Sequence, residues 1–131
     1  MAKVKVIENL VYQEGMDNAG KLDVYLPEGA ENAPLLIYFH GGGLEMGDKA
    51  DDRTMYTELA EQNIIVVSAN YRMYPHIGYP VFIQDAAKAV AYSLECVKEY
   101  VEYGRVWIGG ISAGGYLSMM LHFATDFLKE V

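Results

Sequence analysis

The chain has 131 residues, of which 52% are hydrophobic and 21% charged, and its formal net charge is −8. These values are typical of one globular domain with a hydrophobic core, and they exclude a disordered chain. The excess of negative charge makes nucleic acids and anionic membrane surfaces poor partners.

Two strands and a loop are predicted first. Residues 4–12 are rich in strand-forming side chains, and residues 15–20 contain the glycines of a turn. Residues 21–26 alternate between apolar and other side chains, with Asp23 interrupting the second face, so we expect a half-exposed strand. Residues 27–34 contain glycine and two prolines and are predicted to form a loop.

Strands and helices then alternate. Continuously apolar runs, which favour strands buried on both faces, occur at residues 35–39, 64–67 and 106–108. Apolar residues at helical spacing occur at residues 51–62, 81–101 and 113–129. The order predicts a three-layer α/β fold with a mostly parallel sheet. Ligands of such sheets bind beyond the carboxyl ends of the strands.

Cysteine usage and apolar runs indicate the compartment. Cys96 is the only cysteine, so no disulfide can form within the chain, and its apolar surroundings predict a buried thiol. Residues 1–5 lack the apolar segment of a secretory signal peptide. No apolar run approaches the roughly 20 residues that cross a bilayer. We therefore expect a cytoplasmic protein.

The first motif with chemical meaning is Gly110-Ile111-Ser112-Ala113-Gly114, which joins a predicted strand to a predicted helix. A sharp turn at this place exposes the serine oxygen for nucleophilic attack, and the flanking glycines avoid clashes. The helix N-terminus favours negative charge that develops nearby. The alternative interpretation is a glycine-rich turn whose serine only caps the helix.

The second motif is His40-Gly41-Gly42-Gly43, which follows the strand predicted at residues 35–39. Glycines let backbone N–H groups face a cavity that any Cβ would crowd. Gly42 and Gly43 are the candidate donors to an oxyanion, with the N–H of Ala113 as the third. The alternative interpretation is a flexible turn or an anion-binding nest.

Together with their surroundings, these motifs resemble the α/β-hydrolase superfamily, specifically its carboxylesterases with an HGGG motif, such as hormone-sensitive lipase and small bacterial esterases. The resemblance is carried by residues 22–27, 37–43, 70–75, 79–80 with Asp85, and 109–115. It implies Ser112 as nucleophile and Gly42, Gly43 and Ala113 as the oxyanion hole. It also implies hydrolysis of a carboxylic ester through an acyl-enzyme, without a cofactor.

The chain departs from this family at three points. Leu44 stands where an aromatic residue is usual, and His76 stands where an acidic residue is usual. Complete members are roughly twice as long, and their acid and histidine follow the nucleophile. Residues 1–131 are therefore expected to be the N-terminal portion of a single α/β-hydrolase domain, ending after the fifth strand and the nucleophile helix.

The three histidines of the chain differ in their expected distance from Ser112. His122 follows Ser112 by ten residues on one predicted helix, about 15 Å along its axis, which is too far for a hydrogen bond. Its spacing from Asp126 suits a pair on the helix surface. The resemblance implies a structural role for His40 in the glycine loop. His76 lies in an irregular segment and is the only possible stand-in base.

The acidic residues predict no metal site. Asp85 stands near the start of a predicted helix, where its charge suits the positive end of the helix dipole, so we interpret it as structural. Asp48, Asp51 and Asp52 are expected to form a solvated acidic loop and helix start, and they lack histidine or cysteine partners.

The sequence therefore predicts a serine carboxylesterase that acts on short, small-molecule carboxylic esters through an acyl-enzyme, and whose acid and histidine partners are missing from this chain. The alternatives are a non-catalytic module that binds small acyl or carboxylate ligands, a degenerate hydrolase fragment, or a peptidase on the same fold. The strand predicted at residues 105–108 would end the sheet as an exposed apolar edge. We accordingly expect a homo-oligomer or a strand-paired or domain-swapped assembly.

Overall fold

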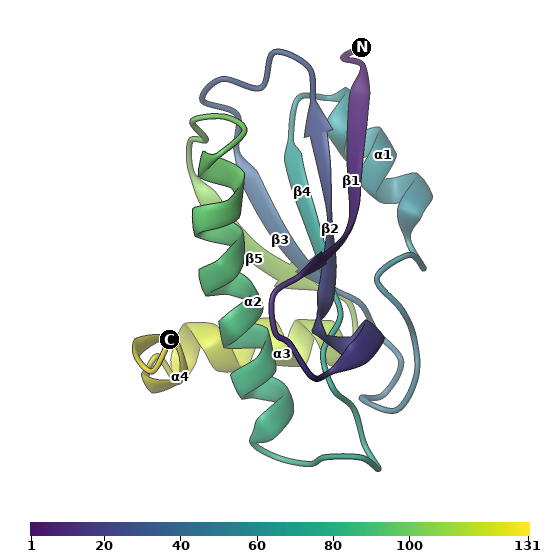
Figure 1. The fold of residues 1–131 in the computed structure, drawn as a ribbon, viewed down its shortest axis with the longest axis vertical. Helices are drawn as coiled ribbons and strands as arrows, with labels where there is room; N and C mark the ends of the chain where they lie inside the picture. Colours follow the sequence, from purple (N-terminus) through teal and green to yellow (C-terminus); the bar gives the residue numbers. More distant parts are fainter.

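Five strands form one sheet in the computed structural model, which describes residues 1–131. The strands are β1 (Val4–Val11), β2 (Lys21–Pro27), β3 (Leu35–Phe39), β4 (Ile65–Ala69) and β5 (Val106–Gly110). Their order across the sheet is β1-β2-β4-β3-β5 (Figure 1). Strands β4, β3 and β5 are parallel, whereas β2 and β1 are added antiparallel at one edge.

Helices cover both faces of the sheet and give the three predicted layers (Figure 1). The helices are α1 (Arg53–Glu61), α2 (Val81–Lys98), α3 (Ala113–Phe123) and α4 (Asp126–Lys129), with a short 3-10 turn at Asp17–Gly20. No helix is both long and apolar enough to span a bilayer. The α/β fold class predicted from the sequence is confirmed.

Side-chain alternation along the strands divides the core in two. On β3, Ile37 and Phe39 pack into the larger cluster, to which α2 and α3 also contribute, whereas Tyr38 packs with α1 on the opposite face. The rings of Tyr25 and Tyr38 both lie with centroids 5.3 Å from that of Tyr56 on α1. The two-residue period of a strand therefore supplies a core on each side of the sheet.

The prediction that β2 is half-exposed is wrong. Asp23, Val24 and Tyr25 are all fully buried. Asp23 lies on the face that α1 covers, and the amine of Lys49 reaches it from the segment that leads into α1. The carboxylate can therefore be buried because a cation is buried with it.

Strand β5 is the edge of the sheet, as expected, but it is not buried as predicted. It pairs with β3 on one side only, and Val106 and Trp107 are 40% and 57% exposed. Part of the open edge is covered locally, since the Ser118 hydroxyl of α3 donates to the Ile108 carbonyl.

The last predicted helix, residues 113–129, is broken into α3 and α4. The backbone of Ala124 leaves the helical region, with φ −112° and ψ 68°, and the chain restarts as α4. The break lets Phe127 and Leu128 of the second piece pack against the larger core cluster. Helix α2 also ends earlier than predicted, at Lys98 instead of residue 101.

A buried carboxylate ties the segment between β4 and α2 to the fold. Asp85 of α2 is fully buried and accepts hydrogen bonds from the N–H, Nε and Nη2 of Arg72 at 3.0, 2.9 and 2.8 Å. The two-pronged geometry between guanidinium and carboxylate fixes direction as well as distance. Asp85 is structural, as the sequence predicts.

Replacing Asp85 with Ala is expected to lower the free energy of unfolding by about 3 kcal/mol, because the guanidinium then loses its buried partner. Urea unfolding followed by circular dichroism measures the change. The matched control is Asp126→Ala, whose carboxylate is 91% exposed and 3.8 Å from the Lys129 amine, and which should leave stability nearly unchanged. Equal stability of the two variants would contradict this role for Asp85.

Candidate active site

Ser112 occupies a strained turn between β5 and α3. Its backbone has φ 53° and ψ −114°, a conformation that residues with a side chain rarely adopt. The residue is exposed, and its side chain makes no hydrogen bond to the start of the helix. The capping-serine interpretation therefore does not describe this turn, and the hydroxyl is left free at the surface.

The two outer glycines of the motif are required by close backbone contacts. A Cβ on Gly114 would collide with the Phe39 carbonyl oxygen, and one on Gly110 would collide with the backbone of Gly114. The first turn of α3 thus packs directly on the end of β3. Since Phe39 and Gly110 are also register partners of parallel strands, both strands end at the same edge of the sheet.

The glycine loop that follows β3 lies against this turn. A Cβ built on Gly41 would be 3.5 Å from the Ser112 Cβ and 3.0 Å from the Ile111 carbonyl oxygen. Gly42 and Gly43 have φ values of 125° and 68°, which favour glycine. The structure therefore brings together the two motifs that are far apart in the sequence.

Three backbone donors of these motifs are free within the chain. No intrachain hydrogen bond uses the N–H of Gly42, Gly43 or Ala113. Ala113 is the first residue of α3, where N–H groups have no partner inside the helix. The carbonyl of Gly42 instead accepts from the N–H groups of Glu45 and Met46, at 3.2 and 3.1 Å, and closes the turn of the loop.

His40 braces the start of the glycine loop. Its buried ring stacks on the ring of Tyr71 at a centroid distance of 4.6 Å, and its Nδ1 lies 2.7 Å from the Gly41 carbonyl oxygen. The Tyr71 hydroxyl donates to the His40 carbonyl at 2.8 Å. Burial raises the pKa of Tyr71 further above neutral pH, where a tyrosine hydroxyl is already a donor. The geometry agrees with the structural role expected for His40.

The segment after β4 borders the glycine loop. The Tyr74 N–H donates to the carbonyl of Leu44 at 2.8 Å, and Leu44 itself has a positive φ of 63°. A cleft beside this contact is lined by residues that include Glu45, Arg72 and His76. His76 is exposed, and no hydrogen bond joins it to Ser112. The chain thus holds His76 near the glycine loop without a direct contact to the serine.

His122 does not form the surface pair that its spacing predicted. Its Nε2 lies 3.4 Å from the Ile108 carbonyl oxygen, and the Asp126 carboxylate pairs with Lys129 instead. The reason is the break at Ala124, which removes the helical register between positions 122 and 126. His122 is therefore attached to the edge strand and not to the serine.

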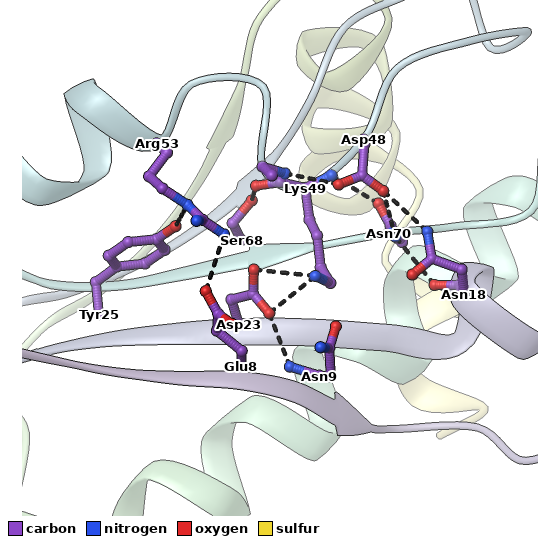
Figure 2. A network of polar contacts seen from close by, with 11 residues as sticks. Glu8, Asn9, Asn18, Asp23, Tyr25, Asp48, Lys49, Arg53, Ser68 and Asn70 are labelled. Carbon is purple, nitrogen blue, oxygen red and sulfur yellow. Dashed lines mark hydrogen bonds and ion pairs between the residues drawn. The ribbon is translucent and has the colours of Figure 1, made fainter.

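Sequence reasoning missed a polar network around Asp48 and Lys49, in the segment that follows the glycine loop (Figure 2). Asp48, expected in a solvated loop, is half-buried and accepts from the side-chain amides of Asn18 and Asn70 and from the Ala50 N–H. Burial by itself raises the pKa of Asp48, but these donors outweigh it and hold the pKa below its usual value. No three His, Cys, Asp or Glu side chains gather in the geometry of a metal site.

A free serine hydroxyl in a strained strand-to-helix turn, beside a glycine loop at the carboxyl edge of the sheet, is the arrangement of an α/β-hydrolase. The comparison with protein families agrees with this class. The chain belongs to the BD-FAE family, whose sequence model matches residues 22–129.

Relatives and solved structures carry names of esterases and of a formamidase. Esterase LipI of Mycobacterium tuberculosis is 38% identical over 97 residues, covering 72% of this chain and 30% of that protein. Kynurenine formamidase of Salmo salar is 29% identical over 120 residues, covering 91% and 39%. Crystalline esterase B of Lactobacillus rhamnosis, in a C6-C4 SN3 inhibited form, has a TM-score of 0.78 and 28% identity, covering 87% and 38%. The chain thus spans less than half the length of these proteins.

Gly114→Ala is expected to lower the free energy of unfolding by about 1–3 kcal/mol, because the added methyl group forces α3 away from β3. Gly115→Ala is the matched control one residue further, where a Cβ would lie 3.4 Å from the nearest atom, the Gly110 carbonyl oxygen. That change should be neutral or stabilise the helix by up to about 1 kcal/mol. Urea unfolding of both variants tests the contact, and equal destabilisation would refute it.

Proposed function

We propose that this chain supplies the nucleophile and the oxyanion hole of a serine carboxylesterase that acts on short carboxylic esters. The observation that carries the proposal is the exposed Ser112, which lies against the glycine loop at Gly41, together with the unused N–H groups of Gly42, Gly43 and Ala113. The names of the relatives support the reaction class. The matched family model supports it as well.

The reaction begins when the Ser112 oxygen attacks the ester carbonyl carbon and a base takes the hydroxyl proton. The electron pair of the C=O bond moves to the oxygen, which then accepts hydrogen bonds from Gly42, Gly43 and Ala113. Loss of one such donor typically costs about 2.7–4 kcal/mol of barrier. Collapse of the intermediate expels the alcohol, which takes up the proton. Water then hydrolyses the acyl-serine by the same steps and releases the acid.

The base and its acidic partner are proposed to lie outside residues 1–131, which are then the N-terminal portion of a single α/β-hydrolase domain. The chain covers only 30% and 39% of the lengths of the two relatives, which supports this proposal. His76, in the segment that touches the glycine loop through Tyr74, is the alternative candidate for a base within the chain, although no hydrogen bond joins it to Ser112. Without a base, the oxyanion hole and binding alone sustain a rate roughly 10³–10⁴ above water. The cytoplasmic location stays a prediction.

Ser112 is expected to be acetylated by p-nitrophenyl acetate with release of p-nitrophenol, and Ser112→Ala should abolish both signals. Absorbance follows the release, and mass spectrometry of peptides locates the acetyl group. Ser118→Ala is the control on the same helix, because its hydroxyl is buried and donates to Ile108. It should react like the unaltered chain.

Two outcomes would count against the esterase. Equal p-nitrophenol release by Ser112→Ala would place the reaction at another residue. No acetylation, together with saturable shifts of the Gly42 and Gly43 amide resonances on adding acetate, would favour the second candidate, a module that binds carboxylates without turnover. The specific observation behind that candidate is that the Ser112 side chain has no hydrogen-bond partner in the chain.

The partner that we propose for the open edge is a second copy of this chain, paired through β5. The support is the unpaired side of β5 with the exposed apolar side chains of Val106 and Trp107. Trp107→Lys should shift the chain toward monomer in sedimentation velocity at high concentration, because a charge on an edge strand opposes pairing. Phe123→Lys removes an equally apolar, 84% exposed side chain outside the strand and should change little. A monodisperse monomer of the unaltered chain would refute the pairing.

A further inference from the structure

The glycine loop, residues 40–43, is held at its start by His40 and also by the segment of residues 47–49, which we call its return. After Gly43 the chain turns at Glu45 and Met46, whose N–H groups donate to the Gly42 carbonyl, and continues through Gly47 to Asp48 and Lys49. Gly47, the first residue of this return, packs its backbone on the His40 ring, where a Cβ would be 2.6 Å from Nδ1. A displacement of residues 47–49 would therefore be passed directly to the loop.

Lys49 is the centre of this return (Figure 2). Its side chain is 7% exposed, and its Nζ lies 2.9 and 3.0 Å from the two carboxylate oxygens of Asp23, which is fully buried. Asp23 also accepts from the Asn9 N–H at 2.9 Å. Asn9 lies at the irregularity in β1, with a positive φ of 60°, so this strand is bent where it donates to the carboxylate.

The backbone of Lys49 is held by β4 and the residue that follows it. The Lys49 N–H donates to Asn70 Oδ1 at 2.8 Å, and the Lys49 carbonyl accepts from the Ser68 hydroxyl at 2.7 Å. The same Asn70 donates to Asp48 through Nδ2 at 3.1 Å. Lys49 is thus tied to β2 by its side chain and to β4 by its backbone, which leaves it little freedom to move.

Stability alone is a weak explanation for an ion pair in this place. Removing two charges from water costs much of what their attraction returns, and apolar replacements of buried pairs are often neutral or stabilising. What this buried pair adds is a fixed position for Lys49, since its Nζ lies 2.9 and 3.0 Å from the two oxygens of a carboxylate that is itself fully buried. Oxyanion donors depend on such confinement, because they act without reorganising during the reaction.

We propose that Asp23 and Lys49 are positioning residues for the oxyanion hole, which hold the return of the glycine loop so that the N–H groups of Gly42 and Gly43 stay directed at the space beside Ser112. Neither side chain touches substrate in this arrangement. The inference rests on the proposed esterase function for its chemical consequence. The part of the inference that concerns loop motion depends only on the contacts described above, and not on the esterase function.

The test replaces the pair together, with Asp23→Leu and Lys49→Met, so that no charge is left buried without a partner. The matched control is Glu95→Leu with Lys98→Met, because that pair is exposed on α2 at 78% and 59% and lies 3.4 Å apart. The first measurement is the ¹⁵N heteronuclear NOE of Gly42 and Gly43. It should fall in the Asp23/Lys49 variant, which reports faster loop motion, and remain unchanged in the control.

The second measurement is acetylation of Ser112 by p-nitrophenyl acetate over a range of concentrations. The limiting rate should fall about 10- to 100-fold in the Asp23/Lys49 variant, while the half-saturating concentration stays the same. The reason is that the N–H groups of Gly42 and Gly43 act on the negative charge that develops on the carbonyl oxygen in the transition state, and not on the bound ester. The control should match the unaltered chain. A merely structural role would lower the melting temperature and leave both the limiting rate and the loop NOE unchanged.

The outcomes separate this inference from the proposed function. Acetylation of the unaltered chain with an equal limiting rate in the Asp23/Lys49 variant would overturn the positioning role and leave the esterase proposal standing. If the unaltered chain is not acetylated, the esterase proposal fails, and the loop NOE decides the inference by itself. Should the double variant fail to fold, Ser68→Ala removes only the hydroxyl that donates to the Lys49 carbonyl. It should lower the NOE of the same two glycines, and an unchanged NOE would overturn the inference.

Discussion

Gly114 brings the first turn of α3 against the carbonyl oxygen of Phe39 so closely that no side chain fits between them. This contact fixes where β5 ends relative to β3, and it therefore fixes where Ser112 stands relative to the glycine loop. If α3 lay farther from β3, the exposed Ser112 hydroxyl would be separated from the free N–H groups of the glycine loop. The site is thus a consequence of backbone packing first and of side-chain chemistry second.

Buried charges complete the arrangement around that contact. The Arg72–Asp85 pair fixes the segment that borders the glycine loop, and the Lys49–Asp23 pair fixes the return of the loop itself. Both carboxylates are fully buried, and each accepts further hydrogen bonds from backbone N–H groups. Two of the buried carboxylates of this chain therefore hold segments that lead to or border the glycine loop.

The sequence predicts those parts of the fold that depend on neighbouring residues. Apolar runs identify β3 and β4, and the glycine spacing predicts the turn at Ser112, because both signals are local. The burial of Asp23 could not be predicted, since its partner Lys49 is 26 positions away and no local pattern pairs the two residues. The break at Ala124 was missed for a related reason, because the apolar periodicity continues through it into α4. Contacts between distant segments override local pattern at both places.

The exposure of β5 at the edge of the sheet determines how the tryptophan fluorescence of this chain behaves. Trp107 on β5 is the only tryptophan of the chain and is 57% exposed. Its indole already meets water in the folded chain, so its fluorescence emission is set by whatever lies over the edge of the sheet more than by the integrity of the core. The intrinsic fluorescence of this chain is therefore a reporter of edge coverage, and global unfolding has to be followed by the signal of the backbone.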